Sequence, residues 1–218
     1  MATGSIELVR PDWPVSARVR ACSTTRRGGV SGAPWHSLNL GGHVGDDMSA
    51  VVRNRERLAR HLALPAEPLW LDQVHGSRVR SAGDHDACAD ACYADTPGRV
   101  CVVLTADCLP VLFSSRDGDE VAAAHAGWRG LLAGVLEETL SRFRGPREGI
   151  VAWLGPAIGP GAFEVGDDVH TAFVDEDKAA GSHFIANRPG HWLADLYGLA
   201  TLRLERAGVG AVYGGGHC

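Results

Sequence analysis

The order of apolar and polar residues along the chain predicts an alternation of strands and helices. Residues 16–22 alternate polar and apolar side chains, which is typical of a half-buried strand. The turn residues Asp117, Gly118 and Asp119 separate two apolar runs, so we expect a β-hairpin there and a mixed rather than an all-parallel sheet. Short apolar runs predict further strands at 69–74, 78–81, 100–105, 111–114, 120–124, 150–154 and 209–213.

Helical spacing of apolar residues predicts four helices, at 49–62, 131–143, 167–173 and 192–207. Ser49 is a suitable N-terminal cap for the first helix, and Gly208 is a suitable stop for the last. The mixture of strands and helices is of the α/β kind in content. Because the chain shows neither an internal repeat nor a low-complexity linker, we expect one domain over 1–218.

Composition narrows the classes of protein to which the chain can belong. Of its 218 residues, 45% are hydrophobic and 22% are charged, which excludes a disordered or collagen-like chain. The net charge of −5 argues against a nucleic-acid partner. No apolar run approaches the ~20 residues of a membrane span, and residues 1–14 lack the pattern of a secretory signal. We therefore expect a cytoplasmic monomer or homodimer without a membrane partner.

Three residues with metal-binding side chains stand at the ends of apolar strands. They are His75, Cys108 and His125, and glycine or proline lies close to each of them. Two imidazoles and one thiolate form a three-ligand zinc set whose fourth position stays open, as in catalytic zinc sites. Spacing alone does not bring the three together. Two ordinary strand-end histidines and a core thiol remain the alternative interpretation.

The turn from Gly127 to Gly130 leads directly into the helical pattern that begins at Leu131. The N-terminus of a helix offers free N–H groups, and Arg129 adds a guanidinium fork, so the turn could hold a phosphate. The alternative is a structural ion pair for Arg129, with Trp128 packed in the core.

Five segments of the chain together resemble the YfiH-type proteins. This is a family of zinc-dependent purine nucleoside phosphorylases that is also catalogued as laccase-domain or polyphenol-oxidase proteins. The segments occur in the family's order and cover the chain from about residue 20 to its end. They are 23–31 with 37–41 and 43–47, 73–76, 105–111, 123–130, and 154–160 with 163–166.

The resemblance implies that His75, Cys108 and His125 bind zinc. It implies a single α+β domain in which mixed β-sheets are sandwiched by helices. The implied reaction is phosphorolysis of adenosine and inosine to the free base and ribose 1-phosphate, so a purine nucleoside and phosphate are the implied partners. Cleavage of 5′-methylthioadenosine and deamination of adenosine are also implied. Family members usually continue past the cysteine that matches Cys218, and we expect activity to depend on whether that segment closes the site.

Five further polar residues are candidates for contacts around the metal. Arg26 and Arg129 are candidates for binding phosphate or ribose, and Asn39 and Gln73 for reading polar edges of the substrate. Asp107 is a candidate for orienting a metal ligand from behind. A purely structural role is an equally good interpretation of each residue.

Three other functions remain open. A copper-dependent polyphenol oxidase is possible because copper competes well for nitrogen and sulfur ligands, although no two histidines flank a single residue as in multicopper clusters. A cysteine hydrolase acting on a peptidoglycan precursor would use Cys108 as nucleophile, His75 or His125 as base and Asp107 as acid. A metal-stabilised binding module is the third, although structural zinc usually has four protein ligands.

Overall fold

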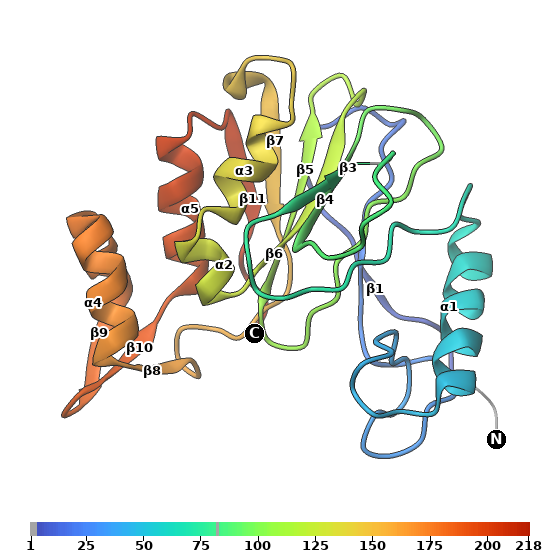
Figure 1. Ribbon diagram of the computed structural model, residues 1–218, viewed down its shortest axis with the longest axis horizontal. Coiled ribbons are helices and arrows are strands. Elements are labelled where there is room, and N and C mark those ends of the chain that lie inside the picture. The colour runs from blue at the N-terminus through green and yellow to red at the C-terminus, as the bar shows by residue number, and fades with distance from the viewer. Residues whose placement is uncertain (1–3, 82) are drawn as a thin grey trace.

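A six-stranded mixed sheet forms the centre of the computed structural model, which describes residues 4–81 and 83–218 (Figure 1). The three inner strand pairs are antiparallel, whereas the pair at each edge is parallel. In spatial order the strands are β11 (Ala211–Gly214), β7 (Ile150–Leu154), β5 (Leu109–Ser115), β6 (Val121–Ala126), β4 (Ala91–Ala94) and β3 (Val79–Ser81).

The hairpin between β5 and β6 confirms the turn predicted at 117–119, and β7 has the predicted bounds. Strand β4 was not predicted, although all four of its residues are buried. The expected strands at 69–74 and 100–105 are wrong as continuous strands. These segments make isolated bridges only, such as the one between Leu69 and Cys101. Neither segment forms a continuous ladder of hydrogen bonds with a neighbouring strand.

The alternation of side chains along each strand gives the sheet two different faces. On β5, Val111 and Phe113 are buried in the main core, whereas Leu112 packs in a separate cluster with Ala123 of β6. Successive side chains of a strand point to opposite faces. His125, two residues after Ala123, therefore lies on the face of the smaller cluster, away from the main core.

Three helices cover the main-core face: α2 (Trp128–Leu132), α3 (Val135–Ser141) and α5 (Leu196–Arg206) (Figure 1). The single helix predicted at 131–143 is in fact two helices, because Gly134 adopts a left-handed φ of 84° that interrupts it. The helix predicted at 192–207 begins too early. Its first residues form β10 (His191–Ala194), and the Asp195 side chain accepts from the Tyr197 N–H to cap α5.

A three-stranded antiparallel sheet and helix α4 (Asp167–Glu176) project from the body beside α5 (Figure 1). The strands are β8 (Glu164–Gly166), β10 and β9 (Phe184–Arg188), in the order β8-β10-β9. The sequence predicted only the helix, at 167–173. Two 3-10 helices complete this half of the chain: η1 (Arg147–Gly149) and η2 (Lys178–His183).

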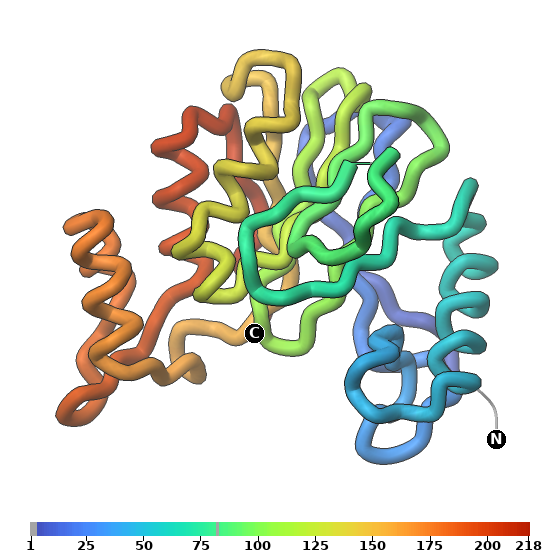
Figure 2. Tube along the Cα trace, viewed as in Figure 1, coloured from blue at the N-terminus to red at the C-terminus, as the bar shows by residue number. Residues whose placement is uncertain are grey.

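The N-terminal part contains α1 (Met48–Leu62) and a two-stranded pairing of β1 (Leu8–Val9) with β2 (Ser23–Thr24). The strand predicted at 16–22 is wrong. This blue stretch in Figure 2 instead reaches the β5–β6 hairpin, where the Ser16 N–H donates to the Arg116 carbonyl over 3.2 Å. The cap of α1 is Asp47 rather than Ser49, since the Asp47 carboxylate accepts from the Ser49 N–H.

Among the described residues, no helix is both long enough and apolar enough to cross a membrane.

Candidate metal centre

The structure brings the three metal-binding residues singled out in the sequence together. His75 lies in the loop before β3, Cys108 directly precedes β5, and His125 is the last residue but one of β6. Their ligand atoms lie within 4.8 Å of one another. Because β5 and β6 are antiparallel with Leu109 opposite Ala126, the beginning of β5 lies beside the end of β6. This register places the thiol next to the buried imidazole.

The loop that carries His75 is held by the carboxylate of Asp90. The backbone N–H groups of Val74, His75 and Gly76 all donate to it, over 3.1, 2.9 and 2.7 Å. His75 has a left-handed φ of 60°, which is uncommon for a residue with a side chain. The three hydrogen bonds therefore hold the backbone in a conformation that His75 would seldom adopt on its own.

Asp90 also contacts the second imidazole of the group. Its Oδ1 lies 2.9 Å from Nδ1 of His125, and its backbone carbonyl accepts from the His125 N–H over 2.7 Å. Burial alone would lower the pKa of His125, but the hydrogen bonds with Asp90 and Cys108 outweigh it and raise the pKa to about 9. Burial would likewise raise the pKa of Asp90, whose hydrogen bonds hold it below its usual value instead.

Gly127 keeps space open beside the ligands. It caps α2 at the end of β6, and a Cβ at this position would lie 2.7 Å from Sγ of Cys108 and 3.4 Å from Cδ2 of His75. Any side chain here would therefore displace the thiol or the ring. The glycine allows the backbone to approach the three ligand atoms closely.

The three donors fit a metal ion of borderline softness such as zinc or copper. Imidazole nitrogen and thiolate sulfur are typical ligands of both ions, and atoms within 4.8 Å of one another surround one ion after small side-chain adjustments. Three protein ligands leave a position for substrate or water. His75 is exposed and His125 is buried, so the group lies between the core and the surface.

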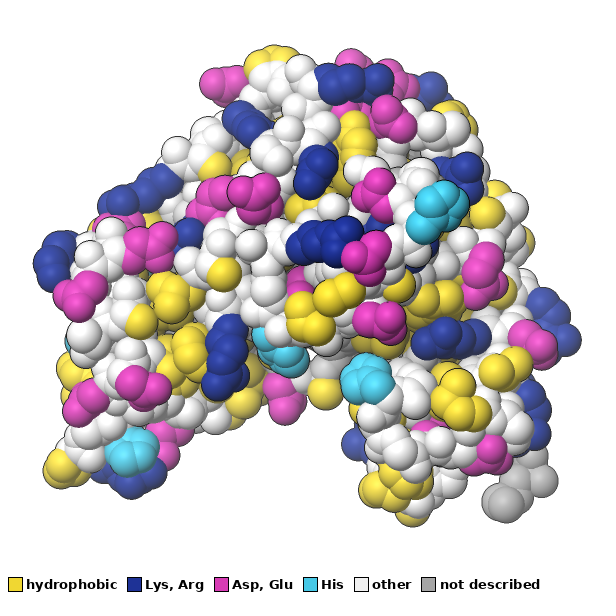
Figure 3. All heavy atoms as spheres, viewed as in Figure 1, with side chains coloured by type: hydrophobic (Ala, Val, Ile, Leu, Met, Phe, Trp, Pro, Cys, Tyr) yellow, Lys and Arg dark blue, Asp and Glu magenta, His cyan; other side chains and the backbone are white. Residues whose placement is uncertain are grey.

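The three ligands line a cleft of about 1580 Å³ on the face of the sheet that the helices leave free. Its walls come from the N-terminal part, the loops before β3 and β5, and the C-terminal residues as far as Cys218. Figure 3 shows a hollow between the N-terminal part, on the right, and the projecting part with α4, on the left. In Figure 1 the C-terminus lies beside this hollow. The volume is ample for a substrate of nucleoside size.

Comparison with known proteins places this architecture in a family. The family model described as multi-copper polyphenol oxidoreductase laccase matches residues 20–218. The chain belongs to this laccase-domain family. "Purine nucleoside phosphorylase YfiH" of Escherichia coli is 55% identical over 215 residues, which cover 97% of this chain and 88% of that relative. "Purine nucleoside phosphorylase PA4543" of Pseudomonas aeruginosa is 55% identical over 210 residues, covering 95% and 86%.

Solved structures of the laccase-domain family have the same fold. Neisseria meningitidis protein NMB0706 superposes with a TM-score of 0.92 at 49% identity, covering 97% of this chain and 88% of that one. YlmD from Geobacillus stearothermophilus superposes with a TM-score of 0.85 at 31% identity, covering 97% and 86%. The resemblance to YfiH-type proteins and the α+β fold expected from it are therefore confirmed.

Three of the predicted substrate contacts of this laccase-domain protein line the cleft, but internal hydrogen bonds occupy them. Arg26 Nε donates to the His36 carbonyl over 2.9 Å. Asn39 Nδ2 donates to the Asp46 carboxylate over 2.9 Å. The Gln73 amide pairs with the backbone of residue 104 in both directions, over 2.7 and 2.8 Å. These side chains shape the walls of the cleft.

Of the other two candidates, Asp107 also lines the cleft, whereas Arg129 lies outside it. Arg129 is exposed on α2, which has only five residues, and its Cζ lies 4.3 Å from the centre of the Trp128 ring. It does not line the cleft. The Asp107 carbonyl accepts from the Ile158 N–H, and its side chain is exposed. The carboxylate that hydrogen-bonds His125 is that of Asp90, and the role expected for Asp107 stays a prediction.

Sequence reasoning missed Asp90 and Gly127. The available signal for Asp90 was one acid inside the apolar run from Ala89 to Ala94, where a buried charge requires partners. Gly127 belongs to the turn at 127–130, for which the sequence predicts phosphate binding. Its closeness to Cys108 depends on the pairing of β5 with β6, which the sequence alone does not specify.

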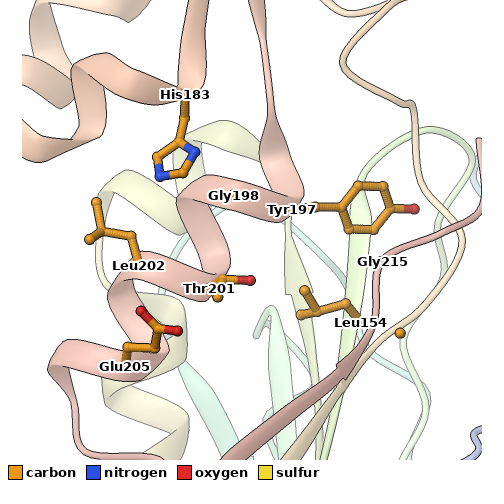
Figure 4. Close-up of a pocket in the computed structure, with 9 residues that line it drawn as sticks. Leu154, His183, Tyr197, Gly198, Thr201, Leu202, Glu205 and Gly215 are labelled. Carbon is orange, nitrogen blue, oxygen red and sulfur yellow. The ribbon is translucent and has the colours of Figure 1, made fainter.

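A second, smaller pocket lies between α5 and the last residues of β7 and β11. It has a volume of about 260 Å³ and shares no lining residue with the cleft. Figure 4 shows Thr201, Leu202 and Glu205 along one face of α5, with His183 at one end of the row. None of the predicted site residues lines this pocket, so the chemistry of the chain gathers in the larger cleft.

Proposed function

We propose that this protein is a zinc-dependent purine nucleoside phosphorylase. The observation that carries the proposal is the group of His75, Cys108 and His125 beside a large cleft, in a chain 55% identical to relatives named purine nucleoside phosphorylases. The proposed substrates are adenosine or inosine together with phosphate.

In the proposed reaction a phosphate oxygen bonds to C1′ of the ribose while the bond from C1′ to the purine nitrogen breaks. The base leaves with the electron pair of that bond and takes up a proton, so the products are the free base and ribose 1-phosphate. The ribose becomes cation-like as the bond breaks, as in other glycosyl transfers. A bound zinc ion would supply Lewis acidity for an anionic or polar group of the substrates.

The residues of the cleft support binding of these substrates. The Arg26 guanidinium gives its wall a positive charge, although its hydrogen bonds to the loop limit its movement. Asn39 and Gln73 hold their loops in place, and the loop of Gln73 also carries His75. Their part in the reaction is to define the space in which the nucleoside lies.

The same cleft is proposed to cleave 5′-methylthioadenosine, because that reaction breaks the same bond. Deamination of adenosine is proposed as a further activity, in which water adds at C6 and ammonia leaves. Which reaction occurs depends on whether C1′ or C6 of the nucleoside lies beside the group of His75, Cys108 and His125. A large cleft is compatible with both orientations.

Copper-dependent oxidation of phenols is the second candidate, and the description of the family favours it. A multicopper oxidase needs several clusters of ligands. Within residues 4–81 and 83–218, His75, Cys108 and His125 are the one group of three such side chains close enough to share an ion. This favours a single-metal enzyme. The relatives named above give no support to the cysteine-hydrolase alternative.

The test is to incubate the zinc-loaded protein with inosine, with and without phosphate, and to measure the release of hypoxanthine. We expect release that depends on phosphate and that is lost in Cys108→Ser. Cys88→Ser is the matched control, because Cys88 is an exposed thiol outside the cleft. Absence of release from protein that holds zinc would contradict the proposal. Oxidation of a phenol by the copper-loaded protein would then favour the second candidate.

A further inference from the structure

The carboxylate of Asp90 connects the two histidines of the metal centre. Asp90 is completely buried directly before β4 and accepts four hydrogen bonds through its side chain. Its Oδ1 receives the backbone N–H of His75 and faces Nδ1 of His125. Its Oδ2 receives the N–H groups of Val74 and Gly76. Each oxygen therefore has two partners.

Only a group that accepts at both ends suits this position. An ionised carboxylate accepts through both oxygens, whereas the amide of asparagine accepts at one end and donates at the other. An amide at position 90 would direct its NH₂ group either at Val74 and Gly76 or at His75 and His125. In both orientations donors would face donors. The loop of His75 and the ring of His125 therefore cannot both keep their present contacts without the acid.

We propose that Asp90 is a positioning residue that sets both histidines of the metal centre at once. By accepting from Nδ1 of His125, it keeps the ring proton on that nitrogen and leaves Nε2 free for the ion. By accepting three successive N–H groups, it holds His75 in its left-handed conformation toward the same ion. The inference rests on the metal centre of the proposed function, but it does not depend on which reaction that centre performs.

A second buried acid of the same sheet shows what a merely structural carboxylate does. Glu120, directly before β6, accepts from the Tyr93 hydroxyl and from the Arg144 N–H, and it touches none of the three ligands. Replacing Glu120 or Asp90 by its amide removes one buried charge in each case. Only the replacement of Asp90 alters a group that is hydrogen-bonded to one of the three metal-binding residues.

The experiment compares Asp90→Asn with Glu120→Gln in zinc affinity, measured by competition with a chromophoric chelator. We expect Asp90→Asn to bind zinc about 10- to 100-fold more weakly, as is typical when the hydrogen-bond partner of a ligand is lost. Its cobalt-loaded form should also have an altered visible spectrum. Glu120→Gln should keep both properties of the wild type, even if its melting temperature falls. Wild-type affinity and an unchanged spectrum in Asp90→Asn would overturn the proposal.

A measurement on the unaltered protein covers the case in which Asp90→Asn does not fold. Nitrogen NMR of the zinc-loaded wild type should find the His125 proton on Nδ1 and the zinc on Nε2. Zinc on Nδ1 would overturn the proposal without any variant. Loss of phosphorolysis with normal zinc binding would contradict the proposed function alone, whereas unchanged zinc affinity in Asp90→Asn contradicts this inference alone.

Discussion

Two loops beside the cleft are each held by one buried polar side chain, and the two anchoring side chains differ in charge. Asp90 anchors the loop of His75 and accepts hydrogen bonds only. Asn54 of α1 anchors the loop that carries Asn39. Its Oδ1 accepts from the Val30 N–H over 2.8 Å, and its Nδ2 donates to three oxygens, including the Asn39 carbonyl over 2.8 Å.

The difference shows which loop is prepared to bind a ligand. The amide of Asn54 satisfies donors and acceptors of its own loop, and the polar atoms of Arg26 and Asn39 are likewise engaged within that loop. The carboxylate of Asp90 satisfies backbone donors and one ring nitrogen, which leaves the other nitrogen of His125 directed elsewhere. The loop of Asn39 forms a wall of the cleft, and the loop held by Asp90 presents His75.

The largest effect is expected for His75→Ala, which removes one of the three proposed metal ligands. Two remaining ligands hold zinc poorly, so we expect zinc affinity and hypoxanthine release to fall at least about 100-fold. His85→Ala is the matched control, since His85 is exposed and does not line the cleft. Zinc content and product release are measured on the same samples. Full zinc retention in His75→Ala would show that the three residues do not act as one centre.

Gly127→Ala is expected to be the next most damaging change. Its Cβ would lie 2.7 Å from Sγ of Cys108, so the thiol has to move. Overpacking of this kind costs about 1–3 kcal/mol, and we expect zinc affinity to fall about tenfold. Gly145→Ala is the control, because a Cβ there meets no atom within 4 Å. Chelator competition measures both variants, and equal affinities would contradict the close approach at Gly127.

Asn54→Ala tests the other loop. It removes the side-chain partner of the Val30 N–H and of the Asn39 carbonyl, and one of two partners of the Ser37 carbonyl. We therefore expect a loss of about 2–4 kcal/mol in the free energy of unfolding in urea. Zinc affinity should stay within about twofold, because Asn54 contacts none of the ligands. Glu56→Ala, an exposed change on the same helix, should alter stability little. A large loss of zinc affinity in Asn54→Ala would show that the two loops are coupled.

The smallest effect is expected for Arg129→Ala. Arg129 is exposed, stacks on Trp128 and lies outside the lining of the cleft, so we expect the KM for phosphate to change less than about twofold. Arg26→Ala should raise this KM further, because Arg26 lines the cleft and supports its loop. Steady-state kinetics with varied phosphate concentration measure the KM of both variants. The reverse order would restore phosphate binding to the turn at 127–130.

The predictions of secondary structure are confirmed where the local residue pattern and the burial of the side chains agree. Strand β7 and the β5–β6 hairpin follow directly from apolar runs and a turn of Asp117, Gly118 and Asp119. The strand expected at 16–22 is wrong because residues 16–19 form a turn, in which the Val19 N–H donates to the Ser16 carbonyl over 2.9 Å. The early start of the last helix failed because β10 belongs to the projecting sheet, whose pairing depends on residues far away in the sequence.

Residue pattern and motifs were sufficient to indicate the residue types of the proposed metal centre, their places at the ends of strands and the family of the chain. Residue spacing could not show that His75, Cys108 and His125 meet, and only the family resemblance implied it. Antiparallel register and a loop held by Asp90 bring them together. Nor could the sequence show which polar residues of the cleft are available to bind a ligand and which only form its wall. That depends on which atoms already have hydrogen-bond partners, and only the tertiary structure supplies those partners, from distant parts of the chain.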